Sequence, residues 1–141
     1  MIKFEKLPDN ILLRIPFAQK LLLAENNVIF AYLFGGLVDG KVKPLSDIDI
    51  AVYLKETKDP AEYKLQLFNR LTDALGTDEL DLVILNRSPI SLNGRILQKK
   101  KILVDKDPFQ RHLYESLTFR NFFDFKKKEE AYFLRRYGIG R

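Results

Sequence analysis

A motif of two glycines and two aspartates in the first third of the chain constrains its fold more than any other feature. An apolar run from residue 28 ends in Gly35 and Gly36, and ten residues separate Gly36 from the sequence Asp47-Ile48-Asp49. Since successive side chains of a strand point to opposite faces, Asp47 and Asp49 are predicted to share one face and Ile48 to lie on the other. The motif therefore predicts two strands joined through a glycine turn, with two carboxylates at the start of the second.

This arrangement predicts a site for a metal ion and a phosphate. Two carboxylates held so close repel each other unless a cation lies between them, and hard divalent ions such as Mg²⁺ prefer carboxylate oxygens. Gly35 and Gly36 lack a Cβ, so their backbone can approach a ligand closely and point N–H groups at phosphate oxygens. We expect Asp47 and Asp49 to bind metal and the two glycines to bind phosphate.

The rest of the chain alternates helical and strand patterns. Apolar periodicity and the positions of proline and glycine predict four helical regions and four strands. The predicted helices cover residues 8–27, with a bend or division at Pro16, 60–75, 89–98, and 108–124 with a continuation through 126–136. The predicted strands cover residues 28–36, 46–54, 79–86 and 101–105. No repeat or low-complexity linker interrupts this order.

Composition limits the alternatives. A chain of 141 residues with 46% hydrophobic content is expected to form a single domain, residues 1–141. The absence of cysteine and the single histidine exclude a disulfide framework, a thiolate metal site and a multi-histidine site. Because no apolar run has membrane-spanning length and the N-terminus lacks the form of a secretory signal, we expect a cytoplasmic protein without membrane association. The net charge of +5 favours acidic partners.

The spacing of the glycines and aspartates resembles that of one known family. A hydrophobic strand, Gly-Gly or Gly-Ser, ten residues and Asp-x-Asp resembles the nucleotidyltransferases of the DNA polymerase β superfamily. The short chain is similar, from about residue 28 onward, to their minimal branch, which includes the MntA antitoxins that are paired with HEPN-domain (HepT) toxins. The resemblance implies the nucleotidyltransferase fold, α/β (α+β), with a small mixed sheet of about four strands flanked by helices and with C-terminal helices. It also implies a third carboxylate on a later strand, which Asp81 matches.

The same resemblance implies a function and a role for each acid. The family transfers a nucleoside monophosphate, here expected to be AMP from ATP, with two Mg²⁺ ions, and pyrophosphate leaves. Asp47 and Asp49 are expected to share the ions and hold the triphosphate through them. Asp81 is expected to ligate the ion beside the attacking hydroxyl and to accept its proton. Ser46 is expected to bind a phosphate or fix the loop, and a simple turn hydroxyl is an equally good interpretation.

Two positions depart from the family pattern. The residue after the first glycine is usually a serine that contacts the triphosphate, whereas this chain has Gly36. Many minimal members carry an arginine where this chain has Asp39, so a cation near the phosphates is replaced by an anion, which weakens nucleotide binding unless Asp39 points to solvent or binds metal. Lys41 or Lys43 is a candidate for the missing positive charge.

The sequence therefore leaves three functions open. The leading interpretation is an MntA-type antitoxin that transfers AMP to a tyrosine hydroxyl on a HEPN partner. The second is a catalytically degenerate antitoxin that acts by binding alone, which Gly36 and Asp39 favour. The third is a small-molecule transferase of the antibiotic-modifying kind, which the short chain disfavours because it leaves no room for an acceptor domain.

The C-terminal third contains basic and aromatic clusters. The lysine runs 99–101 and 126–128 are typical of solvated helix ends, so nucleic acid is not the expected partner. The aromatic residues from Phe119 to Tyr137 are too dense for one small core to bury easily. They indicate either ordinary packing or a surface for a partner or a second copy of the chain.

Overall fold

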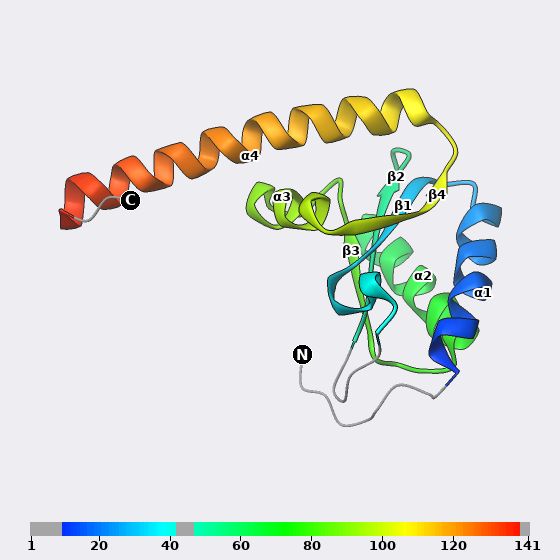
Figure 1. Ribbon diagram of the computed structural model, residues 1–141. Coiled ribbons are helices and arrows are strands. Elements are labelled where there is room, and N and C mark those ends of the chain that lie inside the picture. Colours follow the sequence, from blue (N-terminus) through cyan, green and yellow to red (C-terminus); the bar gives the residue numbers. More distant parts are fainter. Residues whose placement is uncertain (1–9, 42–46, 139–141) are drawn as a thin grey trace.

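The computed structural model describes residues 10–41 and 47–138 (Figure 1). Helices and strands alternate along these residues, as the sequence predicts. The helices are α1 (Ile11–Ala24), the short 3₁₀ helix η1 (Gly35–Asp39), α2 (Pro60–Leu75), α3 (Ile90–Gln98) and α4 (Pro108–Tyr137). The strands are β1 (Val28–Phe34), β2 (Ile48–Leu54), β3 (Leu80–Ile84) and β4 (Lys100–Asp105).

The four strands form one mixed sheet in the order β3-β2-β1-β4. β1 is antiparallel to both β2 and β4, and β2 is parallel to β3. Two parallel neighbours require a crossover connection, which α2 supplies between β2 and β3. The predicted small mixed sheet of four strands flanked by helices is therefore confirmed.

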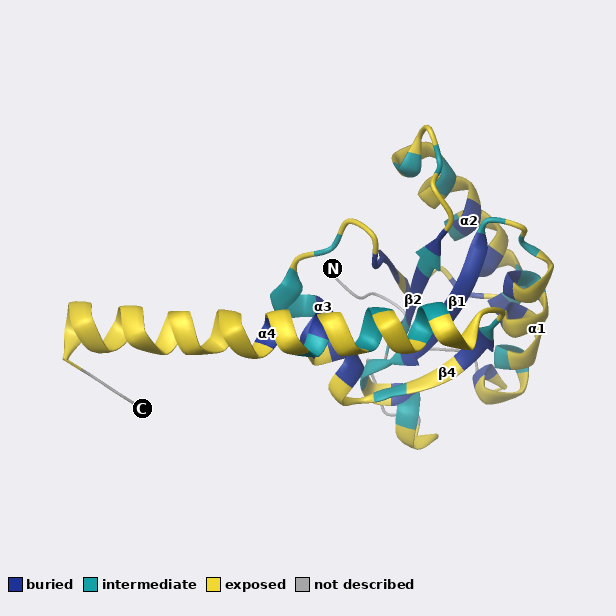
Figure 2. Ribbon diagram, turned by 90° about the horizontal axis from the view of Figure 1, so that it is seen from above, coloured by how far each residue is buried: buried dark blue, intermediate teal, exposed yellow. Residues whose placement is uncertain are grey.

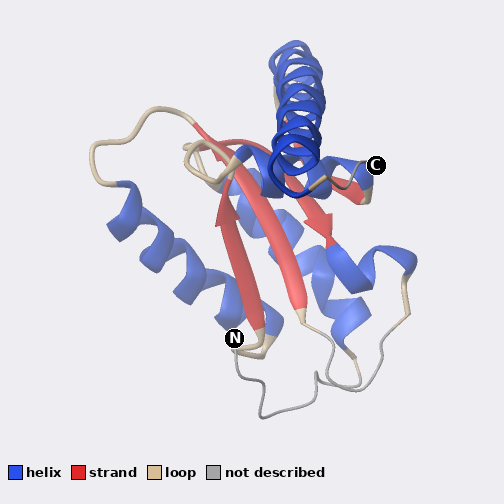
Figure 3. Cartoon of the chain, turned by 90° about the vertical axis from the view of Figure 1, so that its left-hand side faces the viewer, coloured by secondary structure: helices blue, strands red, loops and turns tan. Residues whose placement is uncertain are grey.

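Helices cover both faces of the sheet, and each face has its own core. α1 and α2 pack on one face, where Leu22, Leu71 and Ile50 of β2 belong to one buried cluster. α3 and the first half of α4 pack on the other face, where Phe30 and Ile96 belong to the second cluster. Seen from the side toward which α4 projects, α4 lies nearly end-on above the sheet (Figure 3). The side chains of β2 alternate between the two cores.

The signals that start and stop α2 act as the sequence predicts. Pro60 occupies the first turn, where its missing N–H costs no hydrogen bond, and the Asp59 carboxylate accepts a hydrogen bond from the Glu62 backbone N–H at 3.1 Å. Gly76 follows in the left-handed region, with φ of 73°. Residues with a Cβ avoid that conformation, so glycine ends the helix cleanly.

Two boundary predictions are corrected by the structure. Pro16 lies inside α1 and does not divide it. A proline removes one backbone hydrogen bond, and the packing of Ile11, Ala18 and Leu22 on the sheet, all fully buried, outweighs that loss. The first strand ends at Phe34, because Gly35 and the next residue already belong to η1.

The predicted C-terminal helices are one continuous helix of 30 residues. It begins at Pro108 behind an Asp107 cap, and the left-handed Gly138 follows its last residue. Only its first half contacts the body, and the second half extends beyond α3 as a free arm (Figures 1 and 2). Within residues 10–41 and 47–138, no helix combines the length and the apolar character that crossing a membrane requires.

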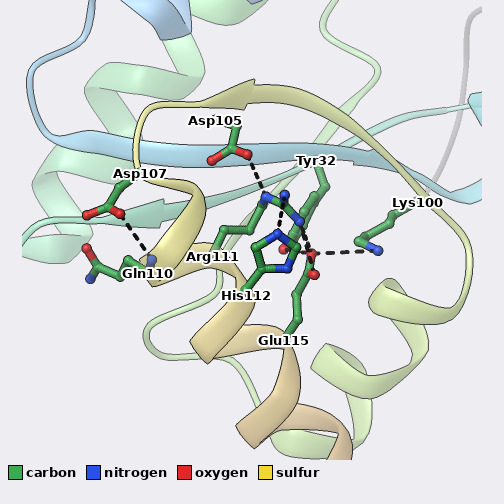
Figure 4. Close-up of polar contacts among 8 residues, drawn as sticks. All are labelled: Tyr32, Lys100, Asp105, Asp107, Gln110, Arg111, His112 and Glu115. Atoms are coloured by element: carbon green, nitrogen blue, oxygen red, sulfur yellow. Dashed lines mark hydrogen bonds and ion pairs between the residues drawn. The ribbon is translucent and has the colours of Figure 1, made fainter.

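A partly buried polar network fixes the first half of α4 to the sheet (Figure 4). Glu115 of α4 accepts a hydrogen bond from the Tyr32 hydroxyl at 2.7 Å, and its carboxylate lies 3.7 Å from Lys100 Nζ. Arg111 bridges Asp105 of β4, at 2.7 Å, and Glu115, at 3.1 Å. Burial raises the pKa of the Glu115 carboxyl, but the Tyr32 hydroxyl and the two cations outweigh it and hold that pKa below its usual range.

Replacing Glu115 with glutamine is expected to lower the free energy of unfolding by about 1–2 kcal/mol at pH 7, since charged hydrogen bonds are lost from a partly buried site. The folded-state pKa of Glu115 lies below the unfolded one, so its contribution is complete above roughly pH 4.3 and is lost as the pH falls through the folded-state value. Urea unfolding of both proteins between pH 7 and pH 3 measures this difference. The exposed Glu130→Gln variant is the control, and a constant difference down to pH 3 would contradict the prediction.

Candidate active site

The sheet brings two of the predicted acids side by side. Asp49 of β2 lies directly opposite Asp81 of β3 in the parallel register, and Phe34 at the end of β1 lies opposite Asp49 on the other side. Neighbouring strands are roughly 4.8 Å apart, so the Asp49 and Asp81 backbones are close neighbours. Their strand neighbours Ala51 and Val83 belong to the core under α3 and α4. Both acids thus share the α3 and α4 face of the sheet, as the alternation predicts.

Gly35 brings the backbone of the glycine turn against the Asp49 carboxylate. A Cβ at Gly35 would overlap the Asp49 side chain, and the residue has φ of 73°, a conformation that side chains with a Cβ rarely adopt. The turn can therefore approach Asp49 only because residue 35 is glycine. Gly36 is different, because it is exposed and a Cβ there would meet nothing within 4 Å.

The three acids suit a hard divalent ion by their chemistry and their access to solvent. Asp47 and Asp49 are partly exposed and Asp81 is exposed, so all of them can reach a ligand from outside. In the described part of the chain, no three histidine, cysteine, aspartate or glutamate side chains are already gathered as a metal site. Carboxylates rotate about single bonds between staggered positions, and Asp49 and Asp81 start from neighbouring backbone positions. The carboxylate oxygens of these three acids are therefore the donor set that Mg²⁺ prefers.

Asp39, the anion at the position of the family's arginine, is paired. Its carboxylate lies 3.1 Å from Lys99 Nζ, and both side chains are more than half exposed. The pair links the end of η1 to the residue before β4. An exposed pair adds little stability, but it balances the negative charge of Asp39 next to the glycine turn. Lys41, the described candidate for this role, is exposed.

A cavity of about 490 Å³ adjoins Asp81 at the edge strand β3. Its walls come from the start of α2, from β3 and from the turn that leads into α3. Lys64 and Arg87 supply positive charge, and Leu92 supplies an apolar wall. Asp59 lines the cavity together with Asp81, so its wall carries charges of both signs.

Sequence reasoning identified part of this site and missed part of it. Ser46 and Lys43 lie outside the described residues, so their expected roles stay predictions. The sequence assigned Lys99 only to a solvated run of lysines. Its ion pair with Asp39 could not be predicted, because the two residues are 60 positions apart and no local sequence pattern connects them. Lys64 and Arg87 likewise come to Asp81 only through the fold.

Comparison with known proteins agrees with this geometry. The family model described as polymerase beta, nucleotidyltransferase, matches residues 18–109. No curated protein matches the chain. The family match runs from α1 to the start of α4 and includes the glycine turn and all three acids.

The fold is similar to solved toxin–antitoxin complexes. A chain in the complex of the tri-AMPylated Shewanella oneidensis HEPN toxin with MNT antitoxin is 24% identical, with a TM-score of 0.65 over 84% of this chain and 93% of that chain. A toxin–antitoxin complex with AMP-PNP is 24% identical, with a TM-score of 0.66 over 89% and 94%. An MntA–HepT complex is 25% identical, with a TM-score of 0.61 over 88% and 93%. Because the family model spans well over half of its length, the chain belongs to the polymerase β nucleotidyltransferase family.

Proposed function

We propose that this protein transfers AMP from ATP to a hydroxyl group of a HEPN-domain partner protein and so acts as an MntA-type antitoxin. The observation that carries the proposal is the register of Asp49 and Asp81 on one sheet face beside the Gly35 turn. The similar complexes support the partner, because one holds an AMPylated HEPN toxin with an MNT antitoxin and another holds AMP-PNP.

In this proposal each acid has a separate role. Asp47 and Asp49 hold the triphosphate side of the site through Mg²⁺, and the backbone of the Gly35 turn binds phosphate oxygens. Bound Mg²⁺ would supply charge neutralisation for the triphosphate and make the acceptor hydroxyl more acidic. Asp81 faces the acceptor, accepts its hydroxyl proton and orients the oxygen for attack.

The transfer itself is a single in-line displacement. The acceptor oxygen attacks the α-phosphorus of ATP, a new P–O bond forms, and the bond from the α-phosphorus to the bridging oxygen breaks. Pyrophosphate leaves with the electron pair, and the hydroxyl proton goes to the Asp81 carboxylate. The cavity beside Asp81, with Lys64 and Arg87 in its wall, accommodates the acceptor side chain.

The direct test is transfer of label from α-labelled ATP to a purified HEPN-domain protein of the same genome, with Mg²⁺. We expect label on a tyrosine of the HEPN protein, and none with the Asp47→Asn/Asp49→Asn variant. Label on an aminoglycoside in place of the HEPN protein would favour the small-molecule transferase. No label despite a stable complex would reject catalysis.

Binding without catalysis is the second candidate, and it is favoured by Gly36 and Asp39. The first removes the family's phosphate-binding hydroxyl, and the second adds an anion beside the turn, although Lys99 balances it. If this candidate is correct, replacing Asp47, Asp49 and Asp81 together leaves neutralisation of the HEPN toxin intact. Loss of neutralisation in that variant would reject it.

Restoring the family's serine tests how much Gly36 costs. Gly36→Ser is expected to tighten binding of ATP roughly three- to tenfold, since one hydrogen bond to a phosphate is gained. The site has room for the side chain, because a Cβ at Gly36 meets nothing within 4 Å. Titration calorimetry with a non-hydrolysable ATP analogue measures the change, and Gly36→Ala is the matched control. Equal affinities for the serine and alanine variants would show that residue 36 does not reach the phosphates.

A further inference from the structure

The second half of α4 is an exposed helical arm, Phe123–Tyr137. Every residue from Phe123 to the end of this helix is exposed, and the arm extends beyond α3 (Figure 2). At 1.5 Å per residue the arm is roughly 22 Å long. A helical segment of this length without tertiary contacts is marginal in water unless an amphipathic face packs on something.

One face of the arm is aromatic. Phe125, Tyr132, Phe133 and Tyr137 recur at helical spacing and remain 37% to 57% exposed. The rings of Phe133 and Tyr137 are 5.6 Å apart, so these side chains cluster. Large exposed aromatic faces of this kind are typical of protein interfaces.

The aromatic face continues the face that packs in the first half of α4. Thr118 and Phe122 are the buried residues of α4, and Phe125, Glu129 and Phe133 follow them at steps of three or four residues. The arm therefore directs its aromatic face to the same side as the packed half of the helix. That half packs on the same sheet face as Ala51 and Val83, and by strand alternation Asp49 and Asp81 share this face. A molecule held against the aromatic face of the arm therefore lies on the side of the sheet that carries the acids.

A groove at the base of the arm adds a second feature. It has a volume of about 930 Å³ and runs between α3 and α4. Phe122 and Phe125 give it apolar walls, and Arg95, Lys126 and Lys127 line it with positive charge. Two acidic residues of the arm, Glu129 and Glu130, also line it.

The charges on the arm favour one of three possible partners, which are a second copy of the chain, a nucleic acid and another protein. The arm carries five basic and three acidic side chains, so two arms from two copies would bring like net charge together. Glu129 lies within the aromatic face, where it would repel a nucleic acid backbone. A protein surface with apolar side chains and carboxylates matches the aromatic rings and the five basic side chains of the arm. Unlike the uniform phosphate backbone of a nucleic acid, it can also present a neutral or basic side chain opposite Glu129.

We infer that the arm is the docking element for the protein acceptor, and that it takes a helix of the HEPN-domain partner bearing apolar side chains flanked by carboxylates. This inference rests on the proposed function for the identity of the partner. The arm holds the acceptor in front of the sheet face, and the site delivers AMP to it. Docking and chemistry thus belong to separate parts of the chain.

The test compares two faces of the same arm. The variant Tyr132→Gln/Phe133→Gln/Tyr137→Gln removes aromatic rings from the docking face, and glutamine preserves helix propensity. Ala131→Gln is the matched control, because Ala131 is exposed and, at about 100° per residue, its side chain points roughly 100° or more away from those of Tyr132, Phe133 and Tyr137. Titration calorimetry with the HEPN protein measures binding, and circular dichroism checks that the helix is kept.

We expect the aromatic variant to bind the HEPN protein at least roughly thirtyfold more weakly, as loss of central aromatic anchors does at protein interfaces. Binding of the HEPN protein by Ala131→Gln and the affinity of the aromatic variant for MgATP are expected to stay unchanged. Unchanged binding in the aromatic variant would overturn the inference, as would a wild-type protein that binds no HEPN protein. A wild-type dimer that the aromatic variant converts to monomers, with partner binding intact, would assign the arm to a second copy. Failure of transfer by a wild-type protein that still binds through the arm would reject only the proposed function.

Discussion

The Asp81→Asn variant is expected to lose transfer of AMP while it still binds ATP. Asp81 lies on the edge strand, beside the cavity for the acceptor, whereas Asp47 and Asp49 belong to β2 and its approach, next to the Gly35 turn. Removing a positioned general base lowers a rate by roughly 10²–10⁴-fold. The dissociation constant for MgATP is expected to change by less than about threefold, or under about 0.7 kcal/mol. The reason is that Asp47 and Asp49, which hold the triphosphate in the proposed mechanism, are unchanged.

Single-turnover transfer and calorimetry with a non-hydrolysable ATP analogue separate these two effects. Asp78→Asn is the control, because Asp78 is a nearby exposed aspartate outside the paired residues of β2 and β3. It should retain both activities. If Asp81→Asn loses ATP binding as severely as Asp49→Asn does, then Asp81 holds the nucleotide and the division of roles proposed above is wrong.

The parts of the fold that the sequence predicts are those with local signals. Pro60 and Gly76 delimit α2 by their own backbone restrictions, and the alternation around Asp49 assigns its face without knowledge of the rest of the sheet. The resemblance added Asp81, which is 32 residues further along the chain. Even so, only the parallel pairing of β2 with β3 places Asp81 opposite Asp49.

The parts that the sequence does not predict depend on contacts between distant segments. The pairing of Asp39 with Lys99 and the hydrogen bond from Tyr32 to Glu115 join residues 60 and 83 positions apart. The length of α4 is a third case. Helical periodicity predicts that the helix continues beyond Phe122. It does not predict that residues 123–137 are exposed, because this depends on how far α3 extends beneath α4 (Figure 2).

A second large effect is expected at the glycine turn, where Gly35→Ala should abolish transfer and Gly36→Ala should leave it nearly unchanged. The two residues are adjacent, and the substitution is the same. At Gly35 the added Cβ would overlap the Asp49 carboxylate, and the left-handed backbone adds roughly 1–2 kcal/mol of strain. At Gly36 the Cβ enters open space.

The overlap can be relieved only if the turn or Asp49 moves, and either movement separates the phosphate-binding backbone from the acid that holds the triphosphate. We therefore expect MgATP affinity and transfer to fall together in Gly35→Ala, each by more than about a hundredfold, since displacements of about 1 Å have effects of that size. Melting temperatures of both variants show whether the fold survives. A folded Gly35→Ala protein with wild-type transfer would mean that the close approach of the turn to Asp49 is not part of the active site.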